Sequence, residues 1–347
     1  MLTVGFARRF ATYKRPNFLL HDPERLIRLL TNPERPMQLI LAGKAHPADK
    51  PGQALIKQWN DFIEWPGMAQ HVVFLSDYDM LMAQELVQGA DLWINTPRRP
   101  WEACGTSGMK TLVNGGLNFS ELDGWWAEAY SPQIGWAIGD GLEHGDDPAL
   151  DGVEAEAMYS LLEREVVPEF YERSANGLPA RWLERVRESM ARLTPEFSAS
   201  RTIQEYTEKH YLPATSAFRE RADKDSALGI ELLKWRYKIA REWNNVRFGT
   251  LQIETHDGQH FFRVQLLPGN LPLSDLKVEL YANPLQAGGS AVETMSVCDQ
   301  CTDSKGTVTY SAQVAATRAA SDYTPRVLPQ HPGVSVPLEA GQILWQR

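Results

Sequence analysis

A run of small residues leads to a lysine in Glu102-Ala-Cys-Gly-Thr-Ser-Gly-Met-Lys110. Residues 105–108 allow close backbone approach, and the free N–H groups at the start of the helix expected there offer an anion site. Lys110 falls one turn inside that helix, before an apolar pair at 112–113, so we expect its amine to be partly desolvated. Desolvation lowers the pKa of a lysine and frees it for Schiff-base formation. A solvated surface lysine is the alternative, since glycine-rich loops before helices are common.

A second group of candidate anion ligands is Arg8-Arg-Phe-Ala-Thr-Tyr-Lys-Arg15, which follows the first apolar run. Its cations gather at the end of an expected strand, just before a helix. Guanidinium groups bind phosphate through paired hydrogen bonds, and lysine adds a point charge. A solvated basic turn is the alternative, because exposed basic clusters are frequent. Together the two segments predict a site for phosphate groups.

The elements that must position these residues alternate along the first two hundred residues. Short apolar runs predict buried parallel strands at 2–6, 37–42, 72–75, 92–94 and 136–138. Amphipathic stretches between them predict helices at 23–30, 53–63 and 81–88, and longer helices follow at 154–167, 180–193 and 198–210, the last with Ser198 as N-cap. This order predicts a doubly wound α/β lobe, in which ligands bind where strands end and helices begin.

After residue 212 the apolar residues follow a different spacing. Residues 212–227 are polar and predict a linker, and a helix is expected at 228–243. Alternating apolar and polar residues then predict strands at 246–254, 260–267, 276–281 and 307–314, which describe a small antiparallel β-sandwich. We therefore expect three parts, 1–212, 213–244 and 245–347. No catalytic residues cluster in the last part, which favours a packing or oligomerisation module, with homo-oligomers as expected partners.

Composition narrows the function further. A length of 347 residues suits two domains, and the net charge of −9 argues against a nucleic-acid partner. No apolar run reaches the roughly 20 residues needed to span a bilayer, and no signal peptide is evident, so we expect a cytoplasmic protein. The pair Cys298 and Cys301 supplies only half of a tetrahedral zinc site, which favours two reduced loop thiols and no metal.

Several motifs together resemble those of one enzyme family, the α-glucan (glycogen or maltodextrin) phosphorylases. The motifs occur in the family's order and spacing: residues 8–15, Ala42-Gly-Lys-Ala-His-Pro47, Tyr78-Asp79, residues 102–110, Asn114-Gly-Gly-Leu-Asn118 and Asp123-Gly-Trp-Trp126. The chain resembles only the C-terminal half, and Asn95-Thr-Pro-Arg-Arg-Pro-Trp101 and the tryptophan pair resemble the bacterial and archaeal branch. The resemblance implies the C-terminal lobe of a GT-B fold.

The resemblance also implies roles for individual residues. Pyridoxal 5′-phosphate would be bound by Lys110, as its Schiff-base partner, and by Thr106, Gly108 and Tyr78. Arg9 and Lys14 would hold the substrate phosphate and act in catalysis with Lys110. The glucose unit would be contacted by Glu102, Gly105 and Cys104. No metal is implied.

The implied reaction is the phosphorolysis of α-1,4-glucan to glucose 1-phosphate with retention. In this family the 5′-phosphate of the cofactor passes a proton to inorganic phosphate. The site must therefore hold two phosphate groups, which explains why the sequence offers cations for both. Ala11 departs from the pattern, because animal members carry a histidine there. The N-terminal lobe of these two-lobed enzymes has no counterpart in this sequence, so we expect it to be a partner in cis or in trans and the site here to be incomplete.

Two other functions compete with this one. A nucleotide-sugar glycosyltransferase of the same fold carries a second glutamate eight positions after the first, where this chain has Lys110, whose amine cannot accept ribose hydroxyls. A non-catalytic glucan-binding or regulatory fragment could use Trp125, Trp126 and Trp136, since aromatic faces stack on sugars. Core and interface packing is the favoured interpretation of these tryptophans.

Overall fold

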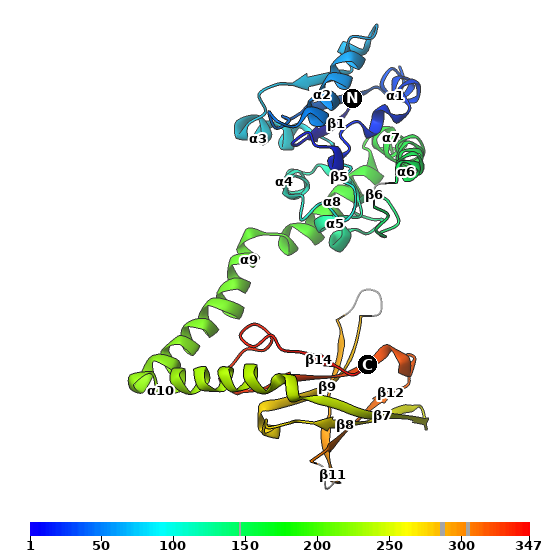
Figure 1. Ribbon diagram of the computed structural model, residues 1–347. Coiled ribbons are helices and arrows are strands. Elements are labelled where there is room, and N and C mark those ends of the chain that lie inside the picture. Colours follow the sequence, from blue (N-terminus) through cyan, green and yellow to red (C-terminus); the bar gives the residue numbers. More distant parts are fainter. Residues whose placement is uncertain (146, 285–288, 303–305) are drawn as a thin grey trace. The chain divides into compact units, whose positions relative to one another are not determined.

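In a computed structural model of the chain, residues 1–145, 147–284, 289–302 and 306–347 are described (Figure 1). The chain forms two compact units, Met1–Glu205 and Tyr206–Arg347.

The N-terminal unit is built on one sheet of six parallel strands. They are β1 (Leu2–Ala7), β2 (Met37–Ala42), β3 (Val72–Leu75), β4 (Leu92–Asn95), β5 (Leu117–Glu121) and β6 (Gly135–Ile138). Their order, β3-β2-β1-β4-β5-β6, is that of a doubly wound sheet, and every neighbouring pair is parallel. The predicted α/β class is therefore confirmed. The strand order reverses between β1 and β4, the place where such sheets bind ligands.

Helices lie between the strands and beyond them (Figure 1). The α-helices are α1 (Pro23–Leu30), α2 (Lys50–Ile63), α3 (Met80–Gly89), α4 (Thr106–Leu112), α5 (Gly124–Ala129), α6 (Pro148–Leu161), α7 (Val167–Tyr171), α8 (Ala180–Glu196) and α9 (Ala199–Tyr206). The short 3-10 helices are η1 (Thr12–Lys14), η2 (Phe18–His21) and η3 (Met68–Gln70), and a π-helical segment, η4 (Leu162–Val166), joins α6 to α7. The predicted N-cap is confirmed, because Ser198 Oγ accepts a hydrogen bond from Arg201 N at 3.2 Å.

The core of this unit explains the near-continuous apolar strands. Every residue of β1 is buried, as expected for a central strand with helices on both faces. Phe6 and Phe119 from the sheet, and Trp59 and Trp182 from helices, belong to one buried cluster. Packing of this kind holds the strand ends, and hence the loops that follow them, in fixed positions.

The C-terminal unit is an antiparallel sandwich, as predicted. One sheet has the order β10-β9-β13-β14 and the other β11-β12-β8-β7. The strands are β7 (Arg247–His256), β8 (Gln259–Leu267), β9 (Leu276–Ala282), β10 (Ala291–Thr294), β11 (Ser296–Thr302), β12 (Val308–Ala315), β13 (Tyr323–Pro329) and β14 (Leu344–Trp345), with short 3-10 helices η6 (Trp243–Asn245), η7 (Leu273–Asp275) and η8 (Ala320–Asp322). Phe262 and Val264 of one sheet and Val278 and Val327 of the other share one core.

The predicted linker is the main difference in this part of the chain. A π-helical segment, η5 (Thr207–Tyr211), leads into α10 (Leu212–Glu242), in which residues 223–226 have non-helical backbone angles and form a kink between two helical stretches. The kink lies within the predicted linker, but the polar residues before it form the exposed surface of a helix. The C-terminal half of α10 carries Trp235 and Ile239, whose side chains join the sandwich core.

The sequence pattern did not predict strands that contain polar residues or are short. The prediction omitted β5, whose Asn118, Ser120 and Glu121 break the apolar pattern and yet are buried. It also omitted β10, β11, β13 and β14 of the sandwich. Cys298 and Cys301, expected in a loop, lie in β11. No helix among the described residues is long and apolar enough to cross a membrane.

Candidate active site

The candidate site lies at the carboxyl ends of β1 and β4, where the strand order reverses. Arg8 follows β1 directly, Lys14 ends η1, and Glu102 lies in the loop after β4. Lys14 Nζ is 2.8 Å from Glu102 Oε2, and Arg8 Nη2 is 2.5 Å from the same oxygen. All three side chains are largely buried, with 8% exposed for Arg8, 10% for Lys14 and 13% for Glu102. The two segments singled out in the sequence therefore meet through this carboxylate.

Two of the three guanidinium nitrogens of Arg8 donate no hydrogen bond within the described residues. Its Nε and Nη1 atoms are buried and have no hydrogen-bond partner within the described part of the chain. Burial lowers the pKa of the guanidinium, while the Glu102 carboxylate acts in the opposite direction. A buried donor without a partner costs about 1 to 3 kcal/mol, so these atoms suit an anionic ligand. By sequence Arg8 is one cation of the basic segment with no predicted role of its own; its position immediately after a buried strand was the available signal.

The two predicted phosphate cations are in different surroundings. Lys14 is buried against Glu102, and its Nζ lies 4.7 Å from the centre of the Tyr13 ring. Arg9 is exposed, and its Nη2 donates a hydrogen bond to the Tyr13 hydroxyl at 3.3 Å. Burial favours a higher pKa for Tyr13, but the hydrogen bonds from Lys14 and Arg9 lower it overall. Tyr13 thus links the two cations.

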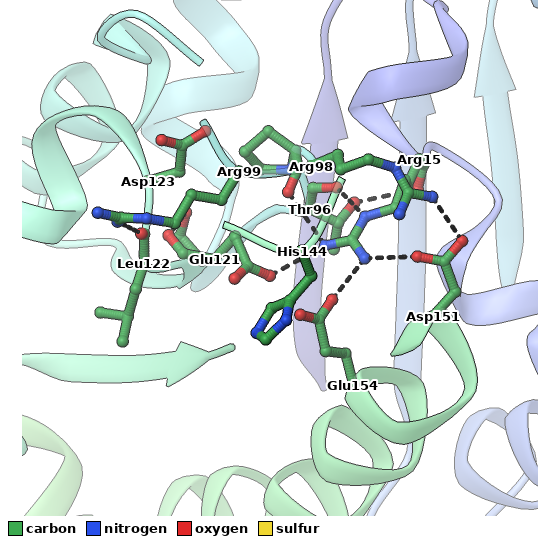
Figure 2. A network of polar contacts seen from close by, with 12 residues as sticks. Arg15, Thr96, Arg98, Arg99, Glu121, Leu122, Asp123, His144, Asp151 and Glu154 are labelled. Atoms are coloured by element: carbon green, nitrogen blue, oxygen red, sulfur yellow. Dashed lines mark hydrogen bonds and ion pairs between the residues drawn. The ribbon is translucent and has the colours of Figure 1, made fainter. Parts of the chain in front are cut away.

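Arg15, the last cation of the same segment, has a different function. Its Nε donates to the Thr96 carbonyl at 2.9 Å, Nη1 contacts Asp151 and Glu154 at 2.8 and 2.5 Å, and Nη2 contacts the Pro97 carbonyl and Glu121 at 3.0 and 2.9 Å. Figure 2 shows these carboxylates around the guanidinium. A guanidinium has five N–H donors, and all five are used here. Arg15 therefore connects η1, the loop after β4, β5 and α6, and has no donor left for a ligand.

The glycine-rich segment forms α4, and its neighbours hold this short helix in place. Trp93 Nε1 donates to Ser107 Oγ at 3.2 Å, and Asn118 Nδ2 donates to the Gly108 carbonyl at 3.1 Å. A Cβ atom at Gly108 would lie 2.3 Å from Asn118 Oδ1, so this close approach requires glycine. Gly105, at φ +92°, precedes the helix and brings the backbone near Glu102: a Cβ built there would lie 3.8 Å from Glu102 Cγ.

Lys110 differs from the expectation. Its side chain is exposed, as is that of Thr106 one turn earlier, so the partly desolvated amine that was predicted is not present in this structure. Leu112, which was expected to shield the amine, is buried against the protein and Val113 is 48% exposed. Residues 106, 110 and 113 lie on one face of the helix, because side chains three or four positions apart are neighbours. That face is directed to solvent.

Two other predicted residues, Tyr78 and Cys104, are half-buried. Tyr78 is half-buried against an apolar cluster that includes Trp93, and burial raises the pKa of its hydroxyl. It precedes α3, which packs against α4. Cys104 is half-buried, and its carbonyl accepts a hydrogen bond from Trp125 N at 2.9 Å. Burial and then the charge of Glu102 raise the pKa of the Cys104 thiol, which therefore remains neutral.

The tryptophans considered as sugar platforms are core residues. Trp125, Trp126 and Trp136 are 5%, 0% and 2% exposed. Trp126 Nε1 donates to the Trp136 carbonyl at 3.0 Å, so this indole also satisfies a backbone group. Core packing, the favoured interpretation, is confirmed. Among the described residues no group of three or more metal-ligating side chains is placed to hold a metal ion.

Comparison with known proteins bears on both units. The family described as carbohydrate phosphorylase matches residues 6–132, which contain the whole arrangement around Glu102, and the family described as glycogen phosphorylase C-terminal domain matches residues 243–347. A glycogen phosphorylase of Mycobacterium tuberculosis is 39% identical over 353 residues, which cover 99% of this chain and 41% of the relative. The chain belongs to the carbohydrate phosphorylase family.

Other members of the phosphorylase family are similarly related. A maltodextrin phosphorylase of Thermococcus litoralis is 40% identical over 84% of this chain and 34% of the relative. A glycogen phosphorylase of Aquifex aeolicus is 46% identical over 61% of this chain and 30% of the relative. The resemblance found in the sequence is confirmed. The chain spans less than half the length of each of these relatives.

Proposed function

We propose that this chain is the phosphate- and cofactor-binding part of an α-glucan phosphorylase. The enzyme would convert α-1,4-glucan and inorganic phosphate to glucose 1-phosphate with retention, in the cytoplasm. The observation that carries the proposal is the meeting of Arg8, Lys14 and Glu102 at the switch point, next to the segment that leads to Lys110. Relatives called glycogen and maltodextrin phosphorylase support it.

The cations would bind inorganic phosphate. Arg9 has an exposed guanidinium, Lys14 a fixed ammonium, and Arg8 two unused buried donors, all on the segment after β1. Charge-assisted hydrogen bonds from such groups are about twice as strong as neutral ones. Phosphate bound here would compete with Glu102 for Arg8 and Lys14, which would leave this carboxylate able to accept hydrogen bonds from sugar hydroxyls. The Gly105 N–H and the neutral Cys104 thiol lie on the same loop and would contact the sugar.

The residues around α4 fit pyridoxal 5′-phosphate. An aldehyde needs an accessible amine, which Lys110 offers, and a phosphate monoester needs donors, which the Thr106 hydroxyl and the backbone N–H groups near it would supply. Thr106 and Gly108 would lie beside the cofactor, and Tyr78 would line its pocket. When bound, the cofactor supplies a phosphate group for proton exchange with the substrate phosphate. Exposure of Lys110 and Thr106 means that other protein surface must cover them for water to be excluded.

The surface that covers these residues would come from the part of the relatives that has no counterpart in this chain. The chain spans 41% of the Mycobacterium tuberculosis relative. We expect an N-terminal lobe, joined in cis or bound in trans, to supply the groove for the acceptor glucan. The arrangement at Glu102 would then form one wall of a closed cleft.

Reductive trapping tests the proposal. The purified chain is incubated with pyridoxal phosphate, reduced with borohydride and mapped by peptide mass spectrometry. We expect the label on Lys110 and its loss in Lys110→Arg, with Lys44→Arg as the control because Lys44 is another exposed lysine of the N-terminal unit. Label spread over several lysines, or none on a folded sample, would contradict the proposed cofactor site and favour a non-catalytic fragment.

A further inference from the structure

The segment from Glu102 to Gly105 is held by a second turn of the chain, which begins at Asp123. The two segments follow β4 and β5, which pair in parallel, so both leave the same edge of the sheet. Hydrogen bonds to the Asp123 side chain and from the Trp125 backbone join them, and Gly124 packs closely between. Each of these contacts fixes the backbone of the segment, not its side chains.

The side chain of Asp123 is used in an unusual way. Asp123 is in the N-cap position of α5, yet its side chain makes no hydrogen bond to that helix. In contrast, the aspartates in the same position of α1, α2 and α3 each cap their own helix, as N-cap aspartates usually do: Asp22, Asp49 and Asp79. Asp123 Oδ2 instead accepts a hydrogen bond from Glu102 N at 2.8 Å, 21 residues earlier in the chain. Asp123 is only 7% exposed, and a hydrogen bond to a charged acceptor is stronger than a neutral one.

Gly124 allows this close approach. Its φ of +53° is in the left-handed region, and a Cβ atom there would lie 2.4 Å from the carbonyl oxygen of Cys104 and 3.1 Å from that of Glu102. Trp125 N, in the first turn of α5, donates to the same Cys104 carbonyl at 2.9 Å. A side chain at position 124 would therefore displace the segment that contains Glu102.

The backbone and the side chain of Glu102 are thus held by different groups. Arg8 and Lys14, which follow β1, hold the carboxylate, and Asp123 holds the backbone N–H. In the proposed function, bound phosphate takes these cations and the carboxylate turns to sugar hydroxyls. The bond to Asp123 does not involve the carboxylate, so it can persist through that exchange.

We propose that Asp123 is a positioning residue for the glucose unit. It keeps the backbone of residues 102–105 in place while the Glu102 carboxylate exchanges its cations for hydroxyl groups of the sugar. Asp123 acts through Glu102 and does not itself touch the substrate. The role of residues 102–105 in sugar binding rests on the proposed function; the contacts that fix their backbone do not.

Titration calorimetry of the full 347-residue chain with two ligands tests the proposal. Inorganic phosphate needs only the cations, whereas glucose 1-phosphate also needs the sugar contacts of residues 102–105. We expect Asp123→Ala to weaken glucose 1-phosphate binding about tenfold and to change phosphate binding by less than about twofold. Asp123→Asn, which keeps an oxygen acceptor for Glu102 N, should restore most of the affinity. A general weakening of the fold would affect both ligands alike.

Hydrogen exchange measures the positioning without any ligand. The Trp125 amide reports whether the segment is in place, because its acceptor is the Cys104 carbonyl. It should exchange about tenfold faster in Asp123→Ala, and also in Gly124→Ala, which displaces the segment but keeps the carboxylate. Asp49→Ala is the matched control: it removes a hydrogen bond of the same kind within α2, and should change neither the Trp125 amide nor glucose 1-phosphate binding. Circular dichroism verifies that each variant is folded.

Two results would overturn the proposal: an unchanged Trp125 amide in Asp123→Ala, or equal losses of affinity for the two ligands. Failure of the proposed function would look different. The unmodified chain would then bind glucose 1-phosphate no more tightly than inorganic phosphate, while the Trp125 amide would still respond to Asp123→Ala. That combination would reject the sugar contacts and retain Asp123 as the residue that fixes this segment.

Discussion

Lys14 Nζ lies 2.8 Å from Glu102 Oε2, although 88 residues separate the two in the chain. Parallel pairing of β1 with β4 brings them together, because the loops after adjacent parallel strands leave the same edge of the sheet. Arg8 contacts the same oxygen. One carboxylate thus faces two cations in a largely buried setting, which has consequences for stability and ligand binding.

Glu102→Gln should lower the free energy of unfolding by roughly 3 to 5 kcal/mol, because it leaves Arg8 and Lys14 without their counter-charge. Glu163→Gln is the control: Glu163 pairs with Arg25 at 2.8 Å but is 35% exposed, so its loss should cost about 1 kcal/mol or less. Urea denaturation measures both.

Inorganic phosphate should recover part of the stability lost in Glu102→Gln, since it can bind the released cations, while chloride at equal ionic strength should not. Equal losses in the two variants, or rescue by chloride, would show that Glu102 is an ordinary surface partner.

The next test uses an enzyme in which this chain is fused to the N-terminal part of a relative. In that enzyme Arg9→Ala should raise the phosphate concentration needed for half-maximal rate about tenfold to a hundredfold. The requirement for glucan should change little. Folding should be unaffected, because Arg9 is exposed. Lys14→Ala should have the same kinetic effect and should also destabilise the fold. Arg28→Ala, at an exposed arginine of α1, is the control. If phosphate and glucan requirements rise together, the basic turn has a structural role only.

Glu121 should make stability depend on pH. Burial, and then the charge of Glu154, raise its pKa from 4.5 to about 8, against the opposing effect of Arg15. The unfolded chain loses this proton near pH 4.5 and the folded chain near pH 8, so the stability contributed by the neutral form is lost as pH rises through this window.

Glu121→Gln keeps a neutral side chain at every pH, so the difference in unfolding free energy between variant and unmodified chain should grow in favour of the variant between about pH 5 and about pH 8. Denaturation at a series of pH values measures that difference. A difference that stays constant across the window would mean that Glu121 is ionised throughout, as a simple partner of Arg15.

The 347-residue chain alone should release no glucose 1-phosphate from maltodextrin, even with pyridoxal phosphate present. Arg9, Thr106 and Lys110 are open to water, whereas the barrier reduction of roughly 8 to 23 kcal/mol needs oriented, water-excluded groups. Addition of the remaining part of a relative in trans should restore turnover if the two parts dock. A phosphate-dependent rate from the chain by itself would require a catalytic group that the structure has not revealed.

The sequence by itself determined the class of both units and the family. Near-continuous apolar strands and helical spacing predicted the parallel sheet, and period-two alternation predicted the sandwich, because both signals depend on neighbouring residues. The segment ending at Lys110, with the basic segment after the first strand, was specific enough to identify the phosphorylase family. Strand β5 was missed because Asn118 and Glu121 are polar; hydrogen bonds to Gly108, 10 residues away, and to Arg15, 106 residues away, accompany their burial.

The tertiary structure alone decided which contacts each cation of residues 8–15 makes. Arg8, Arg9, Lys14 and Arg15 are equivalent by charge and spacing, yet Arg15 uses all five donors on distant groups and Arg8 keeps buried donors unused. It also decided that Lys110 is exposed, contrary to the expectation from its apolar neighbours. Burial and pairing depend on groups about a hundred residues away in the chain, and local sequence carries no information about which of them will be near.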